Sequence, residues 1–179
     1  MDTTHTGHLT LVQACLGFEN AFAAFVADFR QAGECCDQLL SGLLDDYPEY
    51  VRRAQELTHG VAMAHGLVPQ TTYWMVRNRT DILGIGHLRR YLTESLEREG
   101  GHIGYSIRPS ERHKGYGKRF CALLLDEARR ELPTDTVLIT CNTGNRPSAR
   151  IIEANGGVFI DEVISVHTGL PVSRYHVAL

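Results

Sequence analysis

The chain is 179 residues long, 43% of its residues are hydrophobic, and its formal net charge is −3 at pH 7. This length and composition predict a single domain over residues 1–179 with a sizeable hydrophobic core. The slight excess of acidic residues argues against a general nucleic-acid-binding surface, so any site for an anion would have to be local.

The cysteines and histidines show no pattern of disulfides or metal ligands. The five cysteines are odd in number and irregularly spaced, which is typical of free thiols in a reducing compartment. The histidines are scattered, and without a CxxC or HxxxH pair the sequence predicts no metal site. The N-terminal segment MDTTHTGHLT lacks the features of a signal peptide, and no apolar run reaches the about 20 residues of a membrane helix. We therefore expect a cytoplasmic protein without a membrane or nucleic-acid partner.

The first half of the chain alternates between strand-like and helical patterns. Phenylalanines at helical spacing, from Phe18 to Phe29, indicate the buried face of a helix that ends at Gly33. Two β-rich runs surround the polar stretch Arg77–Asp81, which is typical of a hairpin. The predicted elements are a strand at 9–14, a helix at 18–33, a short and then a longer helix within 35–66, and strands at 71–78 and 80–92.

The second half continues with a mixture of strands and amphipathic helices. Apolar residues stand at every fourth position from Tyr116 to Ala128, and Pro133 ends that helix. Asn145 and Gly156 stand where a helix cap and a helix stop are expected. The predicted elements are a helical turn or lid at 93–101, a strand at 101–109, a helix at 114–131, a strand at 136–141, a helix at 145–157, and closing strands at 158–165 and 172–179.

The stretch IRPSERHKGYGKRF, residues 107–120, concentrates five Lys or Arg residues around a Gly-x-Gly step. Pro109 ends the preceding strand, and Gly115 and Gly117 bracket the first turn of a helix at a cost of about 1 kcal/mol each relative to Ala. A helix N-terminus exposes unpaired N–H groups that favour phosphate. The pattern therefore predicts a phosphate cradle formed by the backbone amides of 113–118. The alternative is a solvated basic helix start that tolerates both glycines.

Two other phosphate motifs do not match. A P-loop needs Ser or Thr after its Gly-Lys pair, and Arg119 follows Gly117–Lys118. A dinucleotide-binding fingerprint needs a third glycine at position 120, which is Phe.

The R-x-x-G-x-G pattern at Arg112–Gly117 resembles the acetyl-CoA-binding motif of the GNAT N-acetyltransferase superfamily. The segments GHIGYSIRPSERHKGYG and ITCNTGNRPSARIIEANGG look like those of bacterial members whose acceptors are mostly unassigned. The resemblance runs from about residue 9 and is strongest from Gly101 to Gly157. It implies an α/β fold, with a mixed, mainly antiparallel sheet, helices on both faces, and a CoA-binding core at about 101–157.

The same resemblance implies a site for acetyl-CoA as co-substrate. Strands 102–108 and 136–141 would diverge and leave a slot for the thioester. Asn145 and Ser148 would lie beside the pantetheine arm, although Asn145 also fits a plain helix cap and Ser148 a solvent-facing residue. The backbone around Ile107 and Arg108 would pair with the pantetheine. The pyrophosphate would be held by Arg112, His113, Lys114, Gly115, Tyr116, Gly117 and Lys118.

Acetyl transfer to an amine needs a base that deprotonates the ammonium and hydrogen-bond donors that stabilise the oxyanion. The leaving thiolate also benefits from a proton. Superfamily members usually react by direct attack in a ternary complex, and many use a tyrosine acid where Ile152 stands here. Either the thiolate leaves unassisted, or another residue such as Tyr105 or Tyr175 serves as the acid. Backbone N–H groups near Ile107 or Arg108 would bind the oxyanion. The candidate bases are His102, Glu99 together with Glu97, and His87. Cys141 has no histidine partner that would make it a covalent nucleophile.

Acidic residues in the segments flanking the acceptor side suggest a cationic acceptor, such as a polyamine, an aminoglycoside-like molecule or a peptide N-terminus. They are Glu94, Glu97, Glu99, Asp45, Asp46 and Glu49. Two other interpretations stay open: an acyl-CoA sensor or scaffold without turnover, motivated by Ile152, and binding of a phosphate ligand without CoA. A homodimer through the closing strands also remains open.

Overall fold

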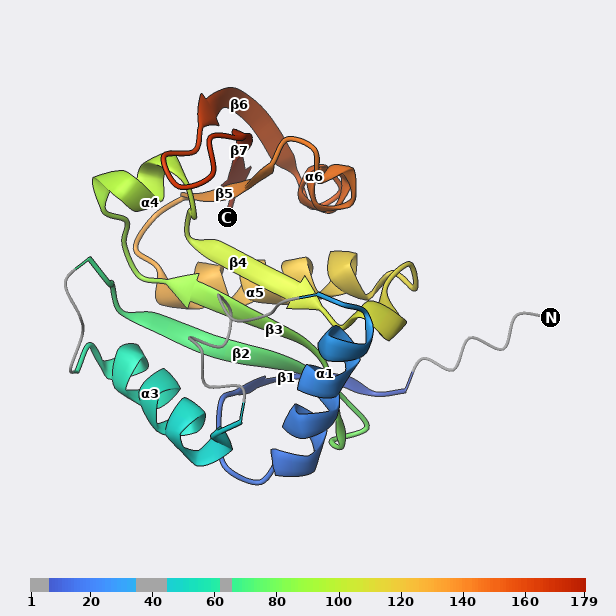
Figure 1. Cartoon of the computed structure of the whole chain (residues 1–179). Coiled ribbons are helices and arrows are strands. Elements are labelled where there is room, and N and C mark those ends of the chain that lie inside the picture. The colour runs from blue at the N-terminus through green and yellow to red at the C-terminus, as the bar shows by residue number, and fades with distance from the viewer. Residues whose placement is uncertain (1–6, 35–44, 62–65) are drawn as a thin grey trace.

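The computed structural model describes residues 7–34, 45–61 and 66–179 (Figure 1). Its centre is one seven-stranded sheet with the strand order β1-β2-β3-β4-β5-β7-β6. Neighbouring strands are antiparallel except for β4 and β5, which are parallel. The strands are β1 Leu9–Gln13, β2 Gln70–Arg77, β3 Asp81–Arg89, β4 Ile103–Ile107, β5 Thr136–Asn142, β6 Gly157–Ile164 and β7 Pro171–Ala178.

Helices cover both faces of the sheet, as expected. Helices α1 and α3 bury one aromatic-rich cluster against β2 and β3, while α5 and α6 pack with the opposite face. Figure 1 shows α1 and α3 in front of the strands and α5 behind β4. The helices are α1 Glu19–Gln31, α3 Tyr47–His59, α4 Glu94–Arg98, α5 Tyr116–Glu131 and α6 Arg146–Glu153, with a 3₁₀ turn η1 at Pro109–Glu111. None of these described helices combines the length and hydropathy of a membrane-crossing segment.

Most predicted elements are confirmed, with shorter bounds. Strand β4 ends at Ile107 because Pro109 starts the 3₁₀ turn, and α5 starts at Tyr116 because Gly115 is left-handed, with φ of 81°. The hairpin of β2 and β3 and the lid helix α4 lie where they were predicted. The longer of the two helices expected within 35–66 is α3, with Pro48 in its first turn, whereas the short helix expected before it falls largely outside the described residues.

Two glycines on β3 let α5 lie close to the sheet. A Cβ on Gly84 would stand 2.8 Å from Ile107 Cδ1 and 2.9 Å from Phe120 Cδ1. A Cβ on Gly86 would stand 2.8 Å from Leu124 Cδ1. Because real Cβ contacts are longer, these glycines set how deeply α5 packs. The N-terminus of α5 is thereby held beside the end of β4.

Candidate active site

A gap opens between β4 and β5 in the middle of the sheet. The two strands pair only at Ile103 and Ile139. Beyond that point β4 stays paired with β3 as far as Ile107, while β5 stays paired with β7 as far as Asn142. The predicted divergence of these strands is therefore present, with a closed end at Ile103 and an open end near the start of α5.

The backbone of β4 presents alternate peptide groups to this gap. The Arg108 N–H donates to the Leu83 carbonyl at 3.0 Å, so the Arg108 amide faces β3. Since peptide groups alternate along a strand, those of Tyr105 and Ile107 face the gap. The position of Ile107 thus suits pairing with an extended ligand. The Arg108 amide, also considered as an oxyanion donor, is already bonded.

The Arg108 side chain is also engaged. Its guanidinium meets the Asp28 carboxylate of α1 at 2.6 Å, and the Ser110 hydroxyl donates to the same oxygen. Burial raises the pKa of Asp28, but these hydrogen bonds from Ser110 and Arg108 outweigh it and leave the pKa lowered. Arg108 therefore ties α1 to the end of β4 and does not stand free for a cofactor.

The backbone at the start of α5 forms a nest of N–H groups. His113 and Gly115 both have left-handed φ values, 62° and 81°. Within the described part of the chain, the N–H groups of 113–118 make no hydrogen bond. Consecutive free amides in such a conformation, at the positive end of a helix, form a site for phosphate oxygens.

Gly115 and Gly117 are required in this nest for different structural reasons. A Cβ on Gly115 would meet open space, so the residue is needed for its left-handed backbone. A Cβ on Gly117 would stand 2.7 Å from Ile151 Cδ1. Gly117 therefore lets α6 approach the first turn of α5. The sequence predicts that a phosphate ligand approaches the backbone at these glycines. At Gly117 the group that approaches the backbone closely is the neighbouring helix α6.

The cations around the nest are only partly available. Arg112 pairs with Glu34 through two bonds of 2.6 and 2.7 Å, and its guanidinium lies 5.6 Å from the Phe29 ring centre. Arg112 also donates to the Ile107 carbonyl at 3.0 Å, so it braces the loop. Lys114 pairs with Glu111 at 3.0 Å. Lys118 is exposed and makes no ion pair within the described ranges.

A buried polar cluster lies between β4, α5 and the start of α6. The Tyr105 ring packs edge-on against Phe120, with 6.1 Å between ring centres. Its hydroxyl is buried and has no aligned hydrogen bond in the described structure, although Ser148 and Cys121 lie near enough to influence its pKa. Burial raises the pKa of Tyr105, and it raises that of Cys121 to about 11. Both groups are therefore protonated at neutral pH.

Helix α6 begins at the open end of the gap. The Asn145 side chain accepts a hydrogen bond from the Ser148 N–H at 3.1 Å, so Asn145 caps the helix. Ser148 is half-buried and contacts Cys141, whose pKa burial raises. Ile152 is fully buried in the core beneath this turn. The position where many superfamily members have a tyrosine acid is thus occupied by an apolar core side chain.

Neither candidate histidine is free to act as a base. The Leu138 N–H donates to His102 Nδ1 at 3.0 Å, and His102 N–H donates to the Leu138 carbonyl at 2.7 Å. Nδ1 is therefore an acceptor and Nε2 carries the proton, while burial lowers the pKa. This favours a structural link between β4 and β5. His87 is buried, and its Nδ1 lies 3.1 Å from Thr72 Oγ1.

Glu99 follows the lid helix α4 and lies next to β5. Its side chain is 14% exposed, and Oε1 is buried, 3.2 Å from Nε2 of His167. The adjacent Gly100 N–H donates to Thr140 Oγ1 at 3.0 Å, which fixes Glu99 next to β5. Glu97 is exposed, and its carbonyl accepts a bond from Arg174. Of the candidate bases, Glu99 is the one with a buried side-chain atom that lacks an aligned hydrogen bond in the described structure.

The other acidic residues considered for the acceptor side are used locally or exposed. Asp45 pairs with Arg30 at 2.8 Å, and Asp46 caps α3. Hydrogen bonds from Arg52 and Arg53 hold the pKa of Glu49 at about 2. Glu94 is exposed on α4. Within the described ranges, no three His, Cys, Asp or Glu side chains gather as metal ligands would.

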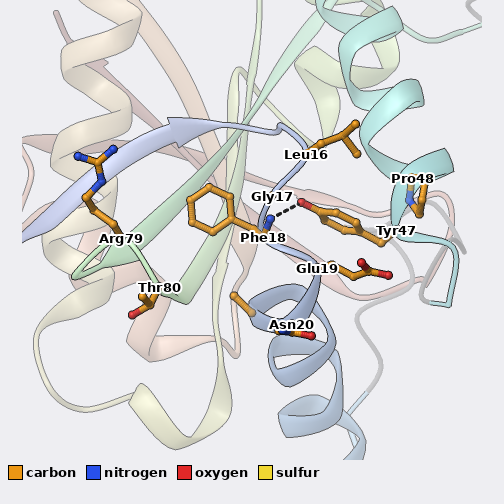
Figure 2. Close-up of a pocket in the computed structure, with 10 residues that line it drawn as sticks. Leu16, Gly17, Phe18, Glu19, Asn20, Tyr47, Pro48, Arg79 and Thr80 are labelled. Carbon is orange, nitrogen blue, oxygen red and sulfur yellow. Dashed lines mark hydrogen bonds between the residues drawn. The ribbon is translucent and has the colours of Figure 1, made fainter.

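A separate open pocket of about 610 Å³ lies between the loop after β1, the start of α3 and the turn of the β2–β3 hairpin. Figure 2 shows the Tyr47 hydroxyl joined to the Phe18 N–H on one side of it, with Arg79 and Thr80 on the other. None of the predicted site residues lines this pocket. It is distinct from the gap between β4 and β5.

The structure also brings in residues that the sequence did not single out. Asp28, Glu34, Thr140 and His167 touch the predicted site from other elements. No motif marks them, because each meets its partner across the fold. A turn with Ser, Thr and Gly, such as the one that contains His167, is ordinary in a hairpin.

Comparison with known proteins agrees with this geometry. No curated protein matches the sequence significantly. Similar solved structures include the microcin C7 self-immunity acetyltransferase MccE in complex with acetyl-CoA and AMP, with a TM-score of 0.68 at 11% identity and 98% of each chain covered. YncA from Salmonella typhimurium with acetyl-CoA has a TM-score of 0.63 at 16% identity, covering 96% of this chain and 94% of that one. RimL, a ribosomal L7/L12 alpha-N-protein acetyltransferase in complex with CoA, has a TM-score of 0.66 at 14% identity, covering 99% and 97%.

At these identities the solved structures establish the fold. The match to a family model is more specific, since the acetyltransferase (GNAT) domain model matches residues 24–158. That match spans the gap, the nest and both helices that flank them. The chain therefore belongs to the GNAT acetyltransferase family.

Proposed function

We propose that this protein transfers an acetyl group from acetyl-CoA to a primary amine by direct attack in a ternary complex. The observation that carries the proposal is the nest of free N–H groups at 113–118, located at the open end of the gap between β4 and β5. Related folds hold acetyl-CoA in MccE and YncA. A cofactor with its pyrophosphate on the nest can extend its pantetheine arm into the gap.

Each residue near the gap has a proposed part in binding. The amides of His113, Gly115, Tyr116, Gly117 and Lys118 would hold the pyrophosphate, with the Lys118 ammonium nearby. The Ile107 peptide would pair with the pantetheine as an added strand does. Asn145 and Ser148 would border it from α6. Arg112 and Lys114 would act through the loop that they brace.

Two side chains would serve the chemistry. Glu99 would take the proton from the acceptor ammonium, since its carboxylate has a buried oxygen without an aligned hydrogen bond and lies next to β5. Tyr105 would donate a hydrogen bond to the leaving thiolate. A CoA thiol has a pKa of about 8.5, so full transfer of a proton from the less acidic Tyr105 would run uphill. The hydroxyl would therefore stabilise the thiolate without giving up its proton, and His102 would hold the strands together.

The proposed acceptor is a small molecule or peptide with a free amine. RimL acts on the alpha amine of a ribosomal protein, and a buried carboxylate at the acceptor side suits any ammonium group. We place the reaction in the cytoplasm, because Cys15, Cys121 and Cys141 are free thiols. A homodimer remains a proposal, supported by the exposed Val158 and Phe159 on the edge strand β6, and light scattering would test it.

The test combines cofactor binding with thiol release. Titration calorimetry with acetyl-CoA should show binding by the wild type and none by Gly115→Glu, whose carboxylate would repel the pyrophosphate. Gly66→Glu is the matched control, since Gly66 is also left-handed with open space around it. Spermidine, an aminoglycoside and a peptide with a free N-terminus then serve as an amine panel. Equal binding by folded Gly115→Glu would refute the cradle, and binding without thiol release would point to a sensor.

A further inference from the structure

The carboxylate of Glu99 has an arrangement that a purely structural residue does not need. Its Oε1 atom is buried without an aligned hydrogen bond in the described structure, which leaves a charged acceptor short of a donor. The nearest group that can carry a proton is Nε2 of His167, 3.2 Å away. Glu99 is 14% exposed, whereas the His167 side chain is 72% exposed. The pair therefore connects a buried oxygen with solvent.

The turn between β6 and β7 holds His167 in this place. The Ser165 hydroxyl accepts hydrogen bonds from the N–H groups of His167, at 3.2 Å, and Thr168, at 3.1 Å. The turn is closed by the bond from Ser165 N–H to the Leu170 carbonyl at 2.9 Å. On the opposite side, Arg98 of α4 donates to the Ile164 carbonyl at 3.0 Å. The lid and the turn are thus joined around the Glu99–His167 contact.

We propose that His167 is a proton relay: it accepts the proton that Glu99 has taken from the acceptor amine and releases it to solvent. This proposal rests on the proposed function. The acceptor ammonium gives a proton to the Glu99 carboxylate and becomes the neutral amine that attacks the thioester. Glu99 then passes that proton to Nε2 of neutral His167 and is again a carboxylate. The resulting imidazolium loses a proton to water or buffer, so every step conserves charge and atoms.

The charged groups on the elements packed around the pair have partners of their own or are exposed. Arg98 donates to the Ile164 carbonyl just before the turn, and Arg174 of β7 is paired with Asp161 at 2.6 Å. The Glu97 carbonyl accepts from Arg174, and its carboxylate is exposed. His102, just before β4, is neutral at pH 7 because burial lowers its pKa. The exposed His167 side chain is open to water, which can take up the proton.

The experiment measures steady-state kinetics with whichever amine of the panel gives thiol release. His167→Ala should lower kcat about tenfold, less than loss of a direct acid or base, with the acceptor KM unchanged. The defect should deepen in dilute buffer, and added imidazole should restore the rate. His167→Gln keeps a polar side chain that cannot take up and release a proton, so it should show the same defect. His59→Ala, at an exposed histidine of α3, is the matched control.

Glu99→Gln separates the relay from the base, because imidazole should not restore its rate. The variants should bind acetyl-CoA like the wild type, which separates the relay from cofactor binding. Wild-type kcat in His167→Ala at low buffer concentration, or a loss that imidazole does not restore, would overturn the relay while the proposed function stands. If the wild type itself releases no thiol with any amine of the panel, the proposed function fails and the relay with it.

Discussion

Replacing Tyr105 by Phe should make the protein more stable and less active. The substitution keeps the ring that packs against Phe120 and removes a hydroxyl that is buried without an aligned hydrogen bond in the described structure. An unsatisfied buried polar group costs about 1–3 kcal/mol. Because Ser148 and Cys121 lie near the hydroxyl, we expect the lower end, a gain of about 1 kcal/mol in the free energy of unfolding.

This gain corresponds to a rise in Tm of about 2–4 °C for a chain of this size. Removing a donor from a developing anion costs about 100-fold in kcat at a strong oxyanion site. The CoA thiolate is a weaker base, so we expect a loss of about tenfold, with the KM for acetyl-CoA unchanged. Thermal unfolding by circular dichroism and initial rates of thiol release measure the two effects on the same protein.

Tyr175→Phe is the matched control for both measurements. Tyr175 is a buried tyrosine that packs edge-on against Phe159 at 5.7 Å, but its hydroxyl is not among the unsatisfied groups. This variant should gain no stability and keep its kcat. If Tyr105→Phe is less stable than the wild type, the hydroxyl has a partner and the reasoning fails. If its kcat is unchanged, the thiolate leaves without help from Tyr105.

Two further predictions concern the pH dependence of stability and the charge at the nest. Burial lowers the pKa of His102 in the folded state, so the unfolded chain binds its proton first and stability falls as pH drops below about 6.5, by at most about 1.4 kcal/mol per pH unit. In urea unfolding, His102→Gln should lose less stability than the wild type between about pH 7.5 and about pH 5.5; equal losses would contradict the burial argument. Glu34→Gln frees the Arg112 charge beside the nest and should tighten acetyl-CoA binding about twofold to fivefold at low salt, with less effect at high salt. Asp126→Asn, in an exposed pair on α5, is the control, and weaker binding by Glu34→Gln would mean that Glu34 is needed for the shape of the loop.

Much of the site followed from local sequence signals. Gly115 marks the left-handed residue before α5, since other residues avoid that backbone conformation. The apolar spacing of α5 and the cap at Asn145 depend on residues within one or two turns. The order of elements along the chain could therefore be predicted from the sequence. The divergence of β4 and β5 was predicted from the resemblance to GNAT members.

Which side chains stay available was decided only by tertiary structure. The sequence predicts that Arg112 adds its charge to the cradle, but Glu34 neutralises it across the fold, just as Asp28 pairs with Arg108. His102 read as a base, yet its Nδ1 is occupied by a backbone N–H of β5. Local patterns specify backbone conformation, because φ and ψ respond to neighbouring residues. The charge and reactivity of a side chain depend instead on what lies within a few ångströms in space, and for these groups that is set by packing between distant segments.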